Sequence, residues 1–123
     1  MRNLLQTTLD TALYPDVLVY WQRRAGPDTD EYVIYTVNGD SGEDFADNTA
    51  LTKNASATVK YYYRVEKAGT YAGRQDIETR ENTIETALKD AGFDMPFGKF
   101  DAGEIDGNGY FVTVFECEYW RVV

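Results

Sequence analysis

The sequence predicts an α+β fold: a single domain, residues 1–123, in which two helices pack on one face of a mixed or antiparallel sheet of four to five strands. The length is typical of one domain and is sufficient to bury one hydrophobic core. Two segments, 55–67 and 110–123, alternate between apolar and polar residues, as half-buried strands do. Two others, 2–14 and 73–92, repeat apolar residues at helical spacing. These patterns together predict a sheet covered by a layer of helices.

The amino-terminal part is expected to form a helix and then a strand. From Arg2 to Tyr14, apolar residues recur near helical spacing at Leu4, Leu5, Leu9, Ala12 and Leu13. Pro15 cannot continue a helix and disfavours helical geometry at the residue before it. The apolar run Val17–Trp21 then predicts a short buried or interface strand. We expect the leucines to lie in the core; the alternative is that they dock a partner.

A second strand and a long polar loop come next. The β-branched and aromatic run Tyr32–Val37 predicts a strand, and the turn before it, Arg23–Asp30, contains glycine and proline. Asn38 and Gly39 end this strand, and we expect a flexible acidic loop at residues 38–54. The candidate assembly residues of this loop are Asp40, Glu43, Asp44, Phe45 and Asp47.

The clearest strand pattern of the chain runs from Ala55 to Lys67, and one long helix, Gly73–Gly92, follows it. The helix stripe that we expect to face the core consists of Ile77, Ile84, Ala87, Leu88 and Ala91. Its outer face is expected to carry Glu78, Glu81, Glu85 and Lys89, the last two as an ion pair four residues apart.

The carboxy-terminal part is expected to form a hairpin. Met95–Ile105 is a weaker strand interrupted by glycine, and Asp106–Gly109 is a favourable hairpin turn. In the last strand, Phe111, Thr113, Phe115, Cys117 and Tyr119 share one face.

The composition excludes several classes of chemistry. The chain has no histidine and one cysteine, Cys117, so thiolate zinc sites and disulfides within the chain are excluded, and we expect this cysteine to be buried. The net charge of −9 disfavours binding to nucleic acids, which requires clustered Lys and Arg. The acidic loop does not have the spacing of an EF-hand, and no motif indicates a phosphate or nucleotide site. We therefore expect no enzyme activity, no cofactor and no metal; no signal peptide or membrane span is expected either.

A candidate oligomer interface lies on the polar faces of two strands. Lys60, Tyr62 and Arg64 share one face of the long strand, and Glu116, Glu118 and Trp120 share one face of the last strand. If these strands are neighbours, the charges are expected to pair across them; otherwise, the two faces can meet between subunits. Aromatic residues beside charges are typical of protein interfaces, whereas a solvated sheet face with ordinary ion pairs is the alternative.

Several local strings resemble the tail-terminator (tail-completion) family of long-tailed bacteriophages and prophages. The strings are Tyr32–Tyr35, Phe45–Asn48, Thr58–Arg64, Ala87–Phe93 and Phe111–Trp120. The resemblance covers most of the chain, but it is a resemblance of pattern rather than of a diagnostic motif. It implies helices on a mixed or antiparallel sheet whose first two strands form a hairpin.

The resemblance also implies a function. Such proteins form a hexameric ring on the tail tube, end its polymerisation and provide the surface that joins tail to head. The implied partners are further copies of the chain, the major tail tube protein and a head-completion or neck protein, while DNA passes through the ring without specific binding. The implied location is the virion tail, assembled in the host cytoplasm. The segment from Asp40 to Asn54 is then the loop that becomes ordered when the ring assembles.

Other functions remain open from the sequence. Neck or head-closure proteins of the head–tail connector are also small, acidic and built from helices and strands. A small binding module with this fold predicts an apolar pocket lined by residues such as Tyr61, Tyr63 and Phe115. An acid–base enzyme that uses Glu116 and Glu118 is the third possibility.

Overall fold

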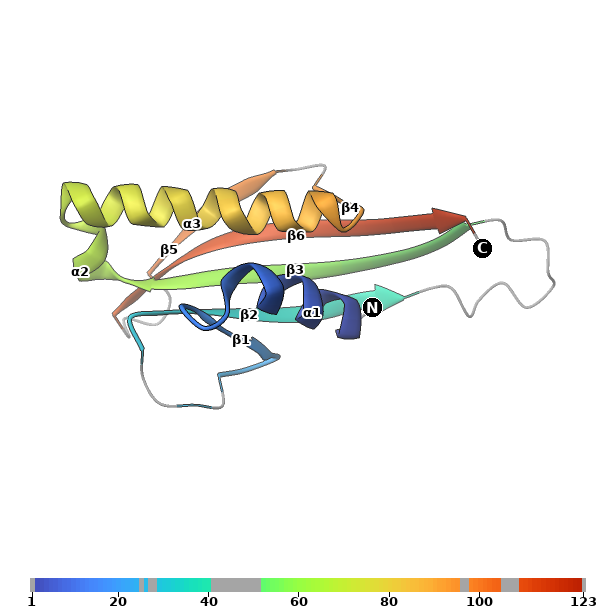
Figure 1. Cartoon of the computed structure of the whole chain (residues 1–123), viewed down its shortest axis with the longest axis horizontal. Helices are drawn as coiled ribbons and strands as arrows, with labels where there is room; N and C mark the ends of the chain where they lie inside the picture. The colour runs from blue at the N-terminus through green and yellow to red at the C-terminus, as the bar shows by residue number, and fades with distance from the viewer. Residues whose placement is uncertain are drawn as a thin grey trace.

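The computed structural model describes residues 2–24, 26, 29–40, 52–95, 98–104 and 109–122. The predicted helices and strands are present in the predicted order, and α2 and β4 are additional (Figure 1). They are α1 (Arg2–Leu13), β1 (Leu18–Trp21), β2 (Glu31–Asp40), β3 (Thr52–Arg64), α2 (Val65–Ala68), α3 (Tyr71–Asp90), β4 (Phe93–Asp94), β5 (Lys99–Glu104) and β6 (Tyr110–Val122). The single-domain α+β fold expected from the sequence is confirmed.

The strands form one mixed sheet in the order β1-β2-β3-β6-β4, with β5 also paired to β6. Within the described ranges the sheet has six strands, one more than expected, because the two-residue β4 adds a short edge. The pairs β2–β3, β3–β6 and β5–β6 are antiparallel, so the predicted carboxy-terminal hairpin is confirmed.

The first two strands are parallel, so they do not form the hairpin that the resemblance implies. Leu18 lies opposite Tyr32 and Trp21 lies opposite Tyr35. At the end of β1, Gln22 adopts a left-handed backbone with φ of 70°, and its N–H donates to the Tyr35 carbonyl at 2.9 Å. The chain therefore leaves β1 alongside β2 and needs the segment up to residue 30 to return to the start of the sheet.

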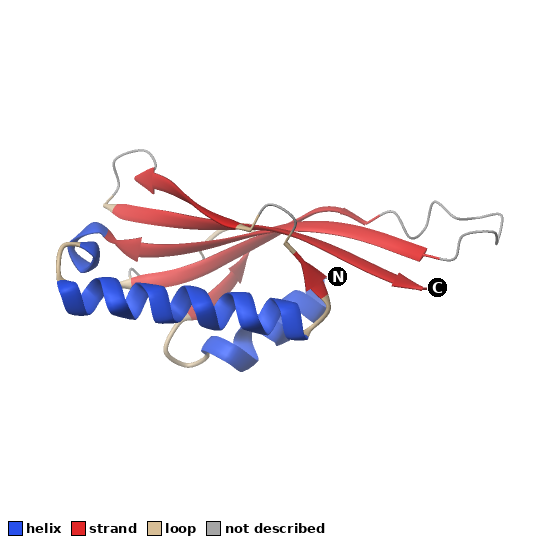
Figure 2. Cartoon of the chain, turned by 90° about the horizontal axis from the view of Figure 1, so that it is seen from above, coloured by secondary structure: helices blue, strands red, loops and turns tan. Residues whose placement is uncertain are grey.

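Both long helices lie on the same side of the sheet, as Figure 2 shows. Leu5, Leu9 and Leu13 of α1 are at most 1% exposed, which confirms that these leucines belong to the core. From α3, Ile77, Ile84 and Leu88 pack into the same cluster, against residues that include Tyr61 and Phe115. The hydroxyl of Thr70 caps α3 by accepting the N–H of Gly73 at 3.0 Å. Among the described residues, no helix combines the length and the hydrophobicity needed to cross a bilayer.

The long strand ends earlier than predicted. Its ladder with β6 stops at the pair Arg64–Tyr110, and residues 65–68 form the helical turn α2 instead of more strand. The reason is that β6 begins at Tyr110, so β3 has no neighbour beyond Arg64. The N–H of Val65 instead donates to the Gly109 carbonyl at 3.1 Å.

The predicted loop at residues 38–54 is partly strand. β2 continues to Asp40 and β3 begins at Thr52, with Gly39 opposite Ser56 and Asp40 opposite Ala55. A bulge lies between Val37 and Gly39, which lets the ladder continue past the turn-forming Asn38 and Gly39. The side chain of Asn38 strengthens this region by donating to the Thr58 hydroxyl at 2.7 Å.

Candidate functional site: the uncovered face of the sheet

The helices leave one face of the sheet uncovered, and we call it the open face. On β3 and β6, every second residue points to it, because side chains alternate along a strand. The odd-numbered partners Val59, Tyr61 and Phe115 are fully buried on the helix face. Lys60, Tyr62 and Arg64 of the candidate interface therefore lie on the open face with Glu116 and Glu118. Trp120 is paired through its backbone with Asn54, and its side chain lies outside the described set.

The predicted charge pairing across neighbouring strands is wrong, although β3 and β6 are neighbours as expected. Their register places Lys60 opposite Val114 and Arg64 opposite Tyr110. Glu116 lies opposite Thr58 instead, and the Thr58 hydroxyl donates to its carboxylate at 3.2 Å. Across the described part of the chain, Lys60 has no ion pair. The cations thus occupy one half of the open face and the carboxylates the other.

The cationic half contains a cluster of tyrosines and arginines. The rings of Tyr32 and Tyr62 are stacked with centroids 4.6 Å apart, and Tyr110 meets Tyr32 edge-on at 5.2 Å. The guanidinium of Arg64 lies 4.8 Å from the centroid of the Tyr110 ring, and that of Arg24 lies 5.1 Å from the Tyr32 ring. We call these five residues the Tyr–Arg cluster. Such contacts between cations and aromatic rings are favourable and hold the arginines in place.

Polar anchors hold the Tyr–Arg cluster against the sheet. The Tyr110 hydroxyl donates to the Thr29 carbonyl at 2.6 Å, and Tyr110 is only 5% exposed. Arg64 lies 3.6 Å from Asp30, whose side chain is 90% exposed. Burial raises the pKa of the Tyr62 phenol, so this residue stays neutral in the physiological range. Tyr32 is buried like Tyr110, so the part of the cluster that reaches the surface is the half-buried Tyr62 ring beside the charge of Arg64.

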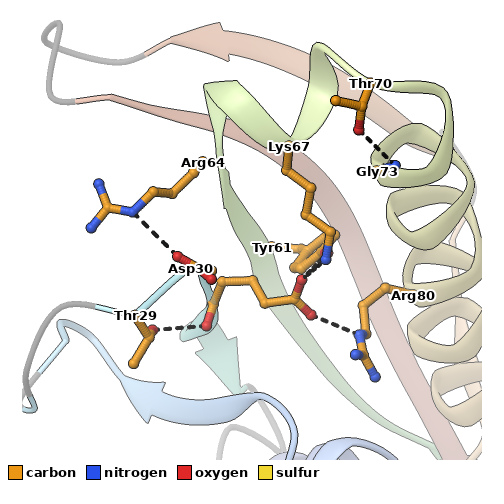
Figure 3. Close-up of polar contacts among 9 residues, drawn as sticks. Thr29, Asp30, Tyr61, Arg64, Lys67, Thr70, Gly73 and Arg80 are labelled. Carbon is orange, nitrogen blue, oxygen red and sulfur yellow. Dashed lines mark hydrogen bonds and ion pairs between the residues drawn. The ribbon is translucent and has the colours of Figure 1, made fainter.

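On the helix face, a buried carboxylate joins two helices to the sheet, and the sequence analysis did not predict it. Glu31 is 8% exposed and accepts hydrogen bonds from Lys67 of α2, from Arg80 of α3 at 2.9 Å and from the Tyr61 hydroxyl at 3.3 Å. Figure 3 shows Lys67 and Arg80 pointing to the same carboxylate from their two helices. Burial and the nearby Glu31 charge raise the pKa of Tyr61. This network fixes the end of the sheet that bears the Tyr–Arg cluster.

A signal for the Glu31 network was present in the sequence. Val33 and Tyr35 of the same strand are buried, and Glu31 lies two residues before Val33. If the predicted strand begins one residue earlier, at Glu31, the alternation of side chains places Glu31 on the helix face as well. On α3, Arg80 lies one turn from Ile77 and one turn from Ile84, within the inward stripe.

Residue Glu81, which was expected to point outward, also points to the sheet. It accepts a hydrogen bond from the Thr113 hydroxyl, and burial raises the pKa of its carboxyl. Glu85 forms the predicted pair with Lys89 at 2.9 Å and a second pair with Lys99 of β5 at 2.8 Å. The Lys99 contact holds the pKa of Glu85 below its usual range. The outer face of α3 is thus narrower than predicted, because the short β5 passes beside it.

A small binding module was expected to have an apolar pocket lined by residues such as Tyr61, Tyr63 and Phe115. Tyr61 and Phe115 are 0% exposed in the packed core, while Tyr63 lines a cleft of about 350 Å³ whose wall combines apolar side chains with charged residues of α3 and β5. Cys117 is buried as predicted. Burial, and to a lesser extent the neighbouring Glu116 charge, raises the pKa of its thiol to about 12. In the described segments, no group of three or more acidic or cysteine side chains is arranged to hold a metal ion.

Of the candidate assembly residues, Asp40 ends β2, while Glu43, Asp44, Phe45 and Asp47 lie outside the described residues. Comparisons with protein-family models and with curated proteins find no match for this sequence.

Proposed function

We propose that this chain is a structural assembly protein of a bacteriophage tail. In this proposal its subunits join into a ring on the end of the tail tube, end the growth of the tube and provide the surface to which the head is joined. The chain acts by binding its own copies and neighbouring tail and head proteins, and it does not catalyse a reaction.

The observation that supports this proposal best is the Tyr–Arg cluster on the open face. Tyrosine and arginine are enriched at protein interfaces and among the residues that dominate binding energy. Here the rings are stacked and anchored before any partner binds, so little side-chain entropy is lost on association. A sheet face that has no helix layer and carries the half-buried Tyr62 and Arg64 on this buried support is suited to contact another protein.

Two further features agree with a ring around DNA. The net charge of −9 disfavours adhesion to a passing DNA duplex, because phosphates repel carboxylates. The strands β3 and β6 also run past the end of α3, so this end of the sheet projects beyond the helix layer (Figure 1). The projection offers strand backbone to a neighbour without displacing the core. The particular assembly, a tail terminator, rests on the sequence resemblance described above.

The test is the mass of the purified protein, measured by light scattering over a concentration series, and then its effect on tail tubes. We expect a discrete hexamer, or a monomer that converts to one, and rings at tube ends in electron micrographs of tubes assembled with the protein. A protein that stays monomeric and leaves tube length unchanged would contradict the proposal. A ring that binds only head connectors, and not tubes, would assign it instead to the neck or head-closure proteins.

A further inference from the structure

We propose that a cleft beside the start of α1 binds a carboxylate, presented as an acidic side chain by a partner protein. The cleft has a volume of about 430 Å³ and is lined by Arg2, Asn3, Gln6, Trp21 and Tyr35. It lies on the helix side of the sheet, where α1 packs against β1 and β2, so it is separate from the Tyr–Arg cluster (Figure 1). The inference goes beyond the proposed ring, because it concerns a second surface and does not require copies of the chain to associate.

The centre of the cleft is an arginine placed over a tryptophan. The guanidinium of Arg2 lies over the Trp21 ring, 4.4 Å from its centroid. This contact holds the cation in place, while the planar fork of N–H groups still matches the two oxygens of a carboxylate. Both side chains are accessible, since Trp21 is 43% exposed and Arg2 is exposed as well. Within the described ranges Arg2 has no ion pair, so its charge is available to a ligand.

The cleft gathers hydrogen-bond donors that have no protein acceptor. Among the described residues, the side chains of Arg2, Asn3 and Trp21 donate no hydrogen bond to the protein. None of the lining residues carries a negative charge. An ionised carboxylate only accepts hydrogen bonds and carries a single charge, so it complements one cation surrounded by neutral donors.

Hydrogen bonds fix the inner wall of the cleft. The Tyr35 hydroxyl donates to the Gln6 carbonyl oxygen at 2.9 Å, and the Gln6 amide donates to Asp10 at 3.0 Å and to the Val19 carbonyl at 3.2 Å. The wall is therefore in place before a ligand binds, which lowers the entropy lost on association. Asp10 lies eight residues along α1 from Arg2, a rise of about 12 Å, so it does not neutralise the arginine.

The shallowness of the cleft favours a protein segment over a free small molecule. Sites for small molecules enclose most of the ligand surface, whereas Arg2, Asn3 and Trp21 are all exposed. A free carboxylate bound here keeps much of its hydration and gains little. A protein segment adds contacts of the residues beside its acidic side chain, and the exposed indole ring offers an apolar surface for them.

The experiment follows the indole N–H signal of Trp21 by NMR, assigned by its loss in Trp21→Phe. The probe is a short peptide, blocked at both ends, with one central glutamate flanked by leucines. We expect it to shift the signal, and we expect the same peptide with glutamine in place of glutamate to bind about tenfold more weakly, because the charge-assisted hydrogen bonds are lost. The net charge of −9 gives an acidic peptide no non-specific attraction to the chain, so its binding reports a local site.

Variants of the arginine test its role. Arg2→Gln should weaken binding of the glutamate peptide by about tenfold, and Arg2→Lys should weaken it less, since lysine keeps the charge but not the planar fork. The matched control is Arg74→Gln, which removes the same charge at an exposed position of α3 and should bind like the wild-type chain. The backbone amide signals of each variant show whether its fold is unchanged.

Each outcome decides a stated point. A Trp21 shift that needs both the glutamate and Arg2 supports the site. Equal binding of the two peptides, equal binding by Arg2→Gln and wild type, or an equal loss in Arg2→Gln and Arg74→Gln overturns it. Acetate that binds as tightly as the glutamate peptide assigns the cleft to free carboxylates and overturns the protein partner. None of these results depends on ring formation, so the proposed function stands or falls separately, on the mass of the protein.

Discussion

Replacing Glu31 by alanine should destabilise the fold more than any exposed charge substitution, because its carboxylate holds α2 and α3 against the sheet. The change removes the acceptor for Lys67, Arg80 and the Tyr61 hydroxyl. Breaking a fully buried ion pair costs about 3–5 kcal/mol. Lys67 and Arg80 are 23% and 27% exposed and can regain some hydration, so we expect a loss of about 2–3 kcal/mol in the free energy of unfolding.

The measurement is urea unfolding monitored by fluorescence, with thermal unfolding as a second method. For a domain of this size the expected loss corresponds to a melting temperature lower by about 10 °C. Asp30→Ala is the matched control, since this neighbouring carboxylate is 90% exposed and lies 3.6 Å from its arginine. It should change stability by no more than about 0.5 kcal/mol.

Glu31→Gln separates charge from hydrogen bonding at the same site, because glutamine keeps one acceptor oxygen and has no charge. We expect a loss between those of the alanine variant and the control. If Glu31→Ala costs no more than Asp30→Ala, the network does not stabilise the fold and the reasoning from burial is refuted.

Three further predictions concern single sites. Gly73→Ala should lower the free energy of unfolding by about 2 kcal/mol although alanine favours helices, because its Cβ would lie 1.9 Å from the Lys67 carbonyl oxygen. Urea unfolding, with the exposed Gln75→Ala as the control, tests this, and a variant more stable than wild type would refute the clash. Cys117 should react with a thiol reagent far more slowly in the folded than in the unfolded chain, because burial raises its pKa to about 12 and shields it; equal rates would contradict this. Glu81→Gln should become more stable relative to wild type as the pH rises above about 4. Burial raises the pKa of Glu81 in the folded state, so the wild-type protein loses folding stability as this carboxyl ionises, whereas glutamine does not ionise. Stability curves of the two proteins that stay parallel with pH would argue against this reasoning.

The sequence predicted those features that follow from local periodicity. The leucine spacing in α1 and the spacing of Ile77, Ile84 and Leu88 in α3 correctly predicted which residues face the core. Alternation along β3 and β6 correctly predicted the two faces of each strand. These patterns can be interpreted without the fold because the helical and strand periods are properties of a few consecutive residues.

The candidate interface shows where local periodicity stops being informative. A strand that slips by two residues keeps the same side chains on the same face, so alternation cannot distinguish registers that differ by two. The register decides whether Lys60 lies opposite Glu116 or opposite Val114, and it places Lys60 opposite Val114. The register is set by how β2, β3 and β6 bury their shared face against the helices, which involves residues far apart in the chain.

The sequence alone therefore determined the fold class, the order of elements, the buried faces and the acidic, histidine-free chemistry of this protein. Only the tertiary structure decided that β1 runs parallel to β2, that Glu31 binds cations from two helices, and that Lys60 and Arg64 lie opposite Val114 and Tyr110 rather than opposite the carboxylates. Each of these depends on contacts between distant segments, whose free energy comes from packing the whole core rather than from the preferences of neighbouring residues.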